Sequence, residues 1–432
     1  MGISVKRNYD LTLLIQKIEK ARIKPGDKVL ISAKLVNEAE GVQFEGFRLQ
    51  EYEAVLFSML SFPKDIPEID ARRLLTKAIF QTAEKGTITR ERLLATLNRL
   101  INEYLQQPVR RYVLATSLSI SLVASLKMPR LRQGNTVIMF GQWPARFYQE
   151  RVRILEYAQH VLHAEIPRNY LEVRVSINAR TVYEAADNAL RMLDLIRGVW
   201  NLQENWRHRI RWSSGRREPV NKILLGPLHT LHDTRGREVT SIWWYEPKYS
   251  GAVRVFRLTD DNIQKMYTFL KGTQKRLSKL PYREQMEEAI IRYTRALDER
   301  DWEGSFLRLW GVLELLTGNP DTYKVIIRRV SWLFGEGENE YHKQVLHHLK
   351  EYRNGIVHYD ESSHAAETYL YQLKYYVEVL IRFHLWNRFG FKSLEEVWEF
   401  LDMPTQVEEI ARQLRVRQLA LRYQQEISAG GT

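Results

Sequence analysis

The chain has 432 residues, of which 44% are hydrophobic and 11% aromatic, and it contains no cysteine. This length allows two or three domains, the apolar content predicts globular ones, and the lack of thiols excludes disulfides, thiolate metal sites and thiol catalysis. The first ten residues are polar, and the longest uncharged stretch, 112–126, is shorter than the roughly 20 residues that a membrane helix needs, so we expect a cytoplasmic protein without membrane contact.

The formal net charge of +13 is unevenly distributed. Residues 281–432 hold 19 Lys and Arg against 24 Asp and Glu, a net charge of −5, whereas residues 1–280 hold 46 against 28, a net charge of +18. If the protein binds a polyanion, the N-terminal part is where long-range attraction and phosphate contacts are expected.

The first predicted region, residues 1–163, is of mixed α+β type. Its predicted elements are a strand at 29–35, helices at 71–82, 89–105 and 145–162, and strands at 117–126 and 136–140. The stretch 117–126 alternates apolar residues with serines, which is typical of a strand with one buried face. A Gly-Asn turn at 134–135 precedes the second of these strands.

The second predicted region, residues 164–280, is basic and also α+β. We predict strands at 171–177, 220–225, 239–245 and 252–256, a long amphipathic helix at 181–202, and another helix that Thr259 caps.

One segment of this region is rich in arginine and tryptophan. The residues that we expect to bind RNA there are Arg207, Arg209, Arg211, Trp212, Arg216 and Arg217. Guanidinium groups interleaved with indole rings suit phosphate contacts and base stacking. The alternative is a solvated loop whose tryptophans, at 206 and 212, pack on the domain.

The third predicted region, residues 281–390, is all-helical, and a helical extension follows at 391–432. Apolar residues recur at helical spacing in five segments: 282–297, 306–316, 323–334, 341–356 and 365–387. Gly318 is expected to stop the second helix, and Gly335 with Gly337 the third. Short connections between such helices predict an antiparallel bundle.

The fourth helix runs into the sequence Glu-Tyr-Arg-Asn-Gly-Ile-Val-His-Tyr at 351–359. Arg353 and His358 are five residues apart, about 140° around an unbroken helix. Gly355 is predicted to loosen or end the helix, which would place Arg353 on its last turn and His358 just beyond.

These residue types suit ribonuclease chemistry without a metal. A guanidinium holds a phosphate through two parallel hydrogen bonds, and an imidazole can move a proton to or from a ribose hydroxyl near neutral pH. In the alternative interpretation Arg353 pairs with Glu314 or Glu351, and His358 caps the helix end.

The motif at Arg353, Asn354 and His358, together with its preceding Tyr352 and the helix at 306–316, resembles the ApeA-like HEPN domain. The resemblance covers residues 281–390, and the rest of the chain is not assigned to a family. It implies a metal-independent endoribonuclease that dimerises so that two Arg-His motifs face each other across one composite site. His358 would then act as general acid or base, Arg353 would stabilise phosphate charge, and Asn354 would orient both.

The resemblance also implies a toxin or anti-phage defence effector, with RNA as its substrate, a possible defence-system partner protein, and sensing by the N-terminal part. No cofactor is expected. Five histidines lie between 342 and 364, but none shows a metal-ligand spacing, so no metal is expected either. Two alternatives remain open: a non-catalytic protein that binds nucleic acid or only dimerises, and a nucleotide-binding sensor.

Overall fold

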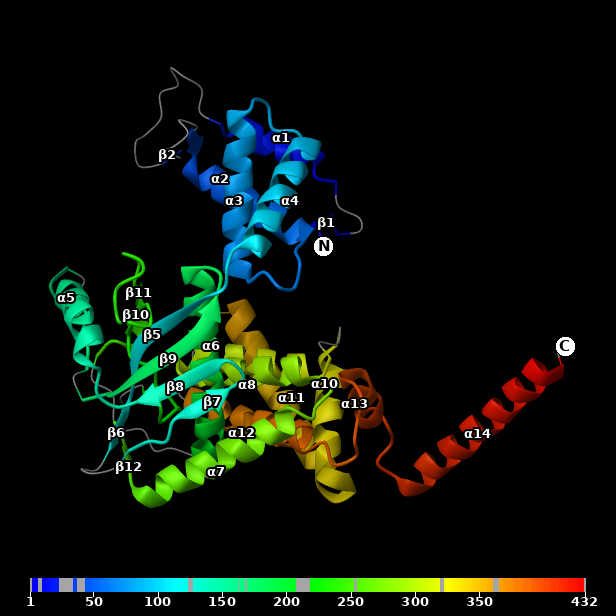
Figure 1. The fold of residues 1–432 in the computed structure, drawn as a ribbon. Helices are drawn as coiled ribbons and strands as arrows, with labels where there is room; N and C mark the ends of the chain where they lie inside the picture. Colours follow the sequence, from blue (N-terminus) through cyan, green and yellow to red (C-terminus); the bar gives the residue numbers. More distant parts are fainter. Residues whose placement is uncertain are drawn as a thin grey trace.

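The computed structural model describes residues 2–6, 10–22, 34–36, 43–122, 127–161, 163–167, 169–206, 218–251, 255–318, 322–359 and 365–430. It confirms the α+β class, with the strands in the N-terminal part and a helical C-terminal part. Figure 1 shows the N-terminal helices above the sheet, and the C-terminal helices beside the sheet, on the side of α6.

The N-terminal helices have a hydrophobic core of their own. The helices are α1 (Thr12–Lys20), α2 (Gly46–Met59), α3 (Glu68–Glu84) and α4 (Arg90–Gln106), with two small strand pairs, β1 (Ser4–Val5) with β4 (Leu60–Ser61) and β2 (Lys34–Val36) with β3 (Gln43–Glu45). The predicted helices at 71–82 and 89–105 are confirmed as α3 and α4, whereas α1 and α2 were not predicted. Most of the predicted strand at 29–35 lies outside the described residues.

A six-stranded sheet follows, in the order β11-β10-β5-β9-β8-β7. Its strands are β5 (Arg110–Leu118), β7 (Leu131–Gln133), β8 (Thr136–Phe140), β9 (Leu171–Ala179), β10 (Leu228–His232) and β11 (Trp244–Tyr245). The longest pairing joins β5 and β9 in antiparallel register from Arg110 opposite Ala179 to Leu118 opposite Leu171. These two strands form the centre of the sheet.

The single strand predicted at 117–126 is divided between two strands in its described part, and residues 123–126 lie outside the described residues. The central strand β5 ends at Leu118, and β6 (Ile120–Leu122) leaves the sheet to pair in parallel with β12 (Phe256–Leu258). Residues 112–116 of β5 are buried on both faces and so do not alternate. The even spacing of apolar residues at 118, 120 and 122 therefore spans two different strands.

Three other strand predictions from the second region also need correction. The segment 220–225 contributes only an isolated bridge from Leu225 to Leu118. Of 239–245 only β11 is a strand. Of 252–256, residues 252–254 lie outside the described residues, and Phe256 is the first residue of β12. The backbone of residues 220–224 instead bonds to buried side chains such as Asn201 and Ser119, which removes the need for a strand ladder.

Two helices cover opposite faces of the sheet. On one face α6 (Val182–Asn205) packs on β9 and β5, capped by Thr181, whose side chain accepts a hydrogen bond from the backbone N–H of Glu184. On the other face α5 (Ala145–Val161) packs on β10, where the Arg151 guanidinium donates to the carbonyls of Ala115 and Leu228. Helix α7 (Asp260–Leu277), capped by Thr259 as predicted, packs beside α6.

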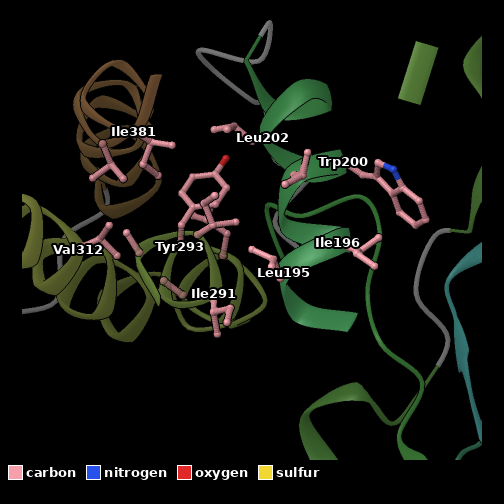
Figure 2. Close-up of a cluster of buried hydrophobic side chains, with 14 of the residues drawn as sticks. Leu195, Ile196, Trp200, Leu202, Ile291, Tyr293, Val312 and Ile381 are labelled. Carbon is pink, nitrogen blue, oxygen red and sulfur yellow. The ribbon is translucent and has the colours of Figure 1, made fainter. Parts of the chain in front are cut away.

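The C-terminal helices form a bundle around the other side of α6. They are α8 (Arg283–Leu297), α9 (Trp302–Leu316), α10 (Tyr323–Ser331), α11 (Gly335–Tyr359) and α12 (Ala366–Trp386). Figure 2 shows Leu195 and Leu202 of α6 facing Ile291 and Tyr293 of α8, and Trp200 directed toward the sheet. One hydrophobic core thus runs from the sheet through α6 into the bundle.

The predicted domain boundaries after residues 163, 280 and 390 fall in the connections that precede β9, α8 and α13 (Leu394–Leu401). The predicted C-terminal extension is helical, as α13 and α14 (Val407–Gly430). Helix α14 projects away from the body (Figure 1). It exposes apolar side chains along its length. Across the described residues, no helix combines the length and the hydropathy that crossing a membrane requires.

Candidate active site

The motif lies near the C-terminal end of α11, which is one continuous helix from Gly335 to Tyr359. The buried positions Leu346, Leu349 and Tyr352 recur every three residues, so one stripe of the helix packs against the bundle. Gly355 is buried too and continues this stripe. The prediction that Gly355 ends the helix is therefore wrong, because packing outweighs the roughly 1 kcal/mol that a glycine costs inside a helix.

The same observation corrects two expectations about neighbouring residues. His358 belongs to the last turn of α11 rather than to the segment beyond it. Gly337, which was expected to help end the preceding helix, lies inside α11. The preceding helix consists of α10 and the short 3₁₀ turn Trp332–Phe334. Gly335, with φ of +72°, makes the break between them, as predicted.

Arg353 is half-buried and lies against an aromatic ring. Its guanidinium carbon is 5.3 Å from the ring centroid of Tyr323 on α10, and Tyr323 in turn meets Trp310 of α9 edge-on at 6.0 Å. Such a cation–π contact holds the cation without neutralising it. Tyr323 was not identified from the sequence, since it lies at the start of the preceding helix, α10, and nothing in its local pattern marks it.

The alternative in which Arg353 pairs with a carboxylate is not supported within the described part of the chain. Glu351 pairs with Lys350 at 2.5 Å, and no ion pair to Arg353 occurs from Glu351, Glu314 or any other described carboxylate. The Arg353 guanidinium therefore forms no ion pair among the described residues.

Asn354 follows Arg353 and is also half-buried. The His358 side chain lies outside the described residues, whereas its backbone position on the helix is described. On a continuous helix, positions 353 and 358 are separated by about 140° in direction and about 7.5 Å in rise. The structure therefore places these residues on one helix but does not bring their positions to one face.

Aromatic side chains surround the inner side of the motif. Tyr352 meets Phe306 edge-on at 5.0 Å and Tyr369 of α12 at 4.7 Å, and the ring of His348 meets Tyr369 at 4.8 Å. These contacts fix α11 against α9 and α12. They give the end of the motif helix a rigid apolar base.

A buried polar network lies deeper in the molecule. Arg197 of α6, which is fully buried, donates to Asp194 at 2.6 Å and to Asp298 at 2.6 Å. Burial alone would lower the pKa of Arg197, but Asp298 with Tyr249 and Asp194 raises it well above its ordinary value. This network is closed off from solvent, and it joins α6 to the end of α8 rather than forming a reactive site.

A second buried pair joins α6 to α12. The Lys374 ammonium donates to Glu378 at 2.9 Å and to the carbonyl of Asn205 at 2.8 Å, and Tyr293 donates to Glu378 at 2.6 Å. Lys374 thereby caps the C-terminal end of α6, directly before the arginine-rich segment. The spacing of Lys374 and Glu378, four residues apart on one helix face, is the sequence signal that could have identified this pair.

The residues that we expected to bind RNA (Arg207, Arg209, Arg211, Trp212, Arg216 and Arg217) lie outside the described residues. The described residue before them is Trp206, whose ring lies 3.8 Å from the guanidinium carbon of Arg382 on α12. Trp206 at the end of α6 therefore contacts the helical bundle. Within the described chain, no group of three or more His, Asp or Glu side chains is placed to hold a metal ion.

Comparison with known proteins gives no match: no family model, no curated protein and no solved structure is similar to this chain. The resemblance of residues 281–390 to the ApeA-like HEPN domain therefore stays a prediction.

Proposed function

We propose that the protein is a metal-independent endoribonuclease whose reactive groups are Arg353, Asn354 and His358. The observation that supports this proposal most strongly is that the Arg353 guanidinium has no carboxylate partner among the described residues. The guanidinium lies half-exposed against the Tyr323 ring. A cation held in place in this way can bind a phosphate through two parallel hydrogen bonds.

The continuous helix supports a site shared between two copies. Positions 353 and 358 of one copy lie about 140° apart, so they cannot both face one phosphate from the same side of α11. In a dimer with α11 against α11, Arg353 of one copy and His358 of the other can meet at one phosphate. Val357, between them in sequence, is an apolar side chain that is 47% exposed, and a second copy would cover it.

The chemistry needs only proton transfer and charge stabilisation. His358 accepts the proton of the ribose 2′-hydroxyl, the freed oxygen attacks the adjacent phosphorus, and the bond to the 5′-oxygen breaks. That leaving oxygen takes up a proton from the protonated imidazole, giving a 2′,3′-cyclic phosphate and a 5′-hydroxyl. Arg353 stabilises the added negative charge on the phosphate oxygens, and Asn354 orients the groups.

The biological role that we propose rests on the resemblance alone: a toxin or anti-phage defence effector that acts on RNA in the cytoplasm. In this scheme the basic N-terminal part, with its net charge of +18, binds the RNA or senses the trigger.

A second candidate function is RNA binding without cleavage. One observation favours it: a single copy does not bring positions 353 and 358 to a common face. In that case the bundle would serve dimerisation, and the motif would have no reaction to perform.

Incubation of the purified full-length chain with total RNA, with and without a metal chelator, distinguishes these functions. We expect cleavage that persists in the chelator, because the proposed groups are an Arg and a His rather than a set of metal ligands. Complete loss of cleavage in the chelator, restored by one divalent metal, would contradict the assigned chemistry. RNA binding without cleavage under either condition would support the second candidate.

A further inference from the structure

The face of the six-stranded sheet opposite α6 carries a separate set of basic side chains. Along β9, Val173, Val175 and Ile177 point into the core that contains α6. Because side chains alternate along a strand, Arg174, Ser176 and Asn178 belong to the opposite face. The antiparallel register places Arg111 of β5 opposite Asn178, on this same face.

Arg132 of β7 completes the set within the sheet. It pairs with Val137 of β8, which pairs with Ser176 of β9, so Arg132 shares the face of Ser176. From strand spacing and rise, the Cα atoms of Arg132 and Arg174 are about 12 Å apart, and those of Arg174 and Arg111 about 14 Å. Arg111 and Arg132 are exposed, and Arg174 is half-buried.

The first turn of α5 adds a fourth arginine at the edge of this face. Arg146 is exposed and lies near Arg174, whose guanidinium carbon is 5.8 Å from the ring centroid of Phe147. Burial, and then the charge of Arg146, lower the pKa of Arg174. The positively charged guanidinium groups of Arg146 and Arg174 therefore repel each other.

These four residues, Arg111, Arg132, Arg146 and Arg174, are called the sheet-face arginines below. In the described part of the chain, none of them has a carboxylate within salt-bridge distance. Arg111 donates only to neutral groups, the Ser176 hydroxyl at 2.8 Å, the Asn178 amide oxygen at 3.2 Å and the carbonyl of Asn135 at 3.3 Å.

Several other surface arginines in the described chain pair with carboxylates instead. Arg153 pairs with Glu238 at 2.9 Å, Arg191 with Glu288 at 2.9 Å, and Arg328 with Asp402 at 2.6 Å. On the sheet face, the Nε of Arg174 is buried without a hydrogen bond. Glu172 on the same face accepts from the backbone N–H of Trp143 at 2.5 Å, and its charge acts on Arg174 although the two form no ion pair. Among the described residues, the guanidinium groups of this face therefore form no ion pair with a carboxylate.

We propose that the sheet-face arginines bind the phosphodiester backbone of RNA. Cations spaced over more than ~10 Å on three strands and one helix fit successive charges of an extended polyanion better than a single phosphate group. The choice of RNA among polyanions rests on the proposed function. The strands and the helix that carry this surface are separate elements from α11, which carries the motif.

The test measures binding separately from cleavage. The full chain is titrated into a short fluorescent 2′-O-methyl oligouridylate, which has phosphates but no free 2′-hydroxyl to react, over a range of salt concentrations. The test variant carries Arg111→Gln, Arg132→Gln and Arg174→Gln. The matched control removes the same charge from the exposed helix α14, by Arg415→Gln, Arg417→Gln and Arg422→Gln.

We expect the test variant to bind RNA about tenfold or more weakly. The slope of log affinity against log salt should flatten by about 2, since three phosphate contacts are lost and each contact on a single strand contributes about 0.7. The control should keep both values. Because Arg111 bonds to its neighbours, Arg132→Glu alone serves as a second variant that leaves those bonds intact, and it should weaken binding in the same direction.

Unchanged affinity and salt slope in the test variant and in Arg132→Glu would overturn the proposal, as would an equal loss in the control. A loss of binding to polyglutamate or anionic vesicles that equals the loss for RNA would assign the face to another polyanion and overturn it too. Cleavage of total RNA by wild type is scored in parallel. Its absence would count against the proposed function only, and normal binding by the test variant would count against this inference only.

Discussion

His384 of α12 is a buried titratable residue that we expect to make the stability of the folded protein depend on pH. Its side chain is 1% exposed and lies edge-on to Tyr282 at 5.8 Å. Burial lowers the pKa of His384 to about 4, and the nearby carbonyl of Leu316 offsets only part of that effect. Burial likewise lowers the pKa of His232 on β10 to about 4. Both rings are therefore neutral in the folded protein near neutral pH.

We expect stability to fall as the pH drops from about 6.5 toward 4. In this window the unfolded chain binds protons on both histidines while the folded chain does not, so the stabilisation that is complete above about pH 6.5 is lost on acidification. Each ring contributes roughly 3 kcal/mol. Thermal unfolding of wild type and His384→Phe over this range measures the effect, and the variant should show a weaker pH dependence.

The exposed residue His347 provides the control for that experiment, because His347→Gln removes a histidine that is not enclosed by the core. Its pH dependence should match wild type. An unchanged pH dependence in His384→Phe would show that His384 does not stay neutral in the folded state.

The packing of helix α6 against α8 depends on a close contact between the two helices at Gly198. A Cβ placed on Gly198 would overlap the Thr294 hydroxyl and come within 2.9 Å of the Ile290 Cγ2 and 3.2 Å of the Ile290 carbonyl. Gly198 is therefore the residue that lets the two helix backbones pack closely.

We expect Gly198→Ala to destabilise the protein by roughly 1 to 3 kcal/mol, since overpacking here outweighs the helix propensity of alanine. Gly311 of α9 is the matched control, because a Cβ there would meet nothing within 4 Å. Gly311→Ala should stabilise by up to about 1 kcal/mol. Chemical denaturation of both variants measures the difference, and equal changes would contradict the packing described for α6.

Local signals in the sequence predicted most of the helices correctly, and long-range packing explains the failures. Thr181 and Thr259 cap helices through side-chain bonds to residues three positions on, which a local pattern can reveal. The outcome at Gly355 depends on the burial of α11 against other helices, which no local pattern contains. For the same reason the alternation at 117–126 could not show that the chain changes sheets after Leu118.

The candidate site was predictable in part. The positions of Arg353 and Asn354 on a bundle helix followed from helical periodicity, whereas the Tyr323 contact depends on how α10 folds back onto α11. The sheet-face arginines had a local signal, the alternation Arg-Val-Ser-Ile-Asn at 174–178. Their gathering on one face depends on strand pairings between distant segments, such as β5 with β9.

At the scale of the whole molecule, the charge is separated along the chain while the core is shared. The excess of basic residues lies in the part that carries the sheet, and the motif lies in the part with a net charge of −5. One core and the buried bond from Lys374 to the end of α6 connect these parts. We therefore expect substrate affinity and cleavage to respond to different substitutions.

Replacement of His358 by alanine tests the proposed catalytic role of α11, with RNA cleavage, RNA affinity, oligomeric state and melting temperature measured on the same preparation. We predict that cleavage falls by roughly 10²- to 10⁴-fold while the other three properties stay near wild type, because the role proposed for the imidazole is proton transfer. Arg353→Ala should reduce cleavage too and can also weaken RNA binding, since a guanidinium contacts phosphate before and during the reaction. Cleavage by His358→Ala at the wild-type rate would contradict the assignment of α11 as the catalytic helix.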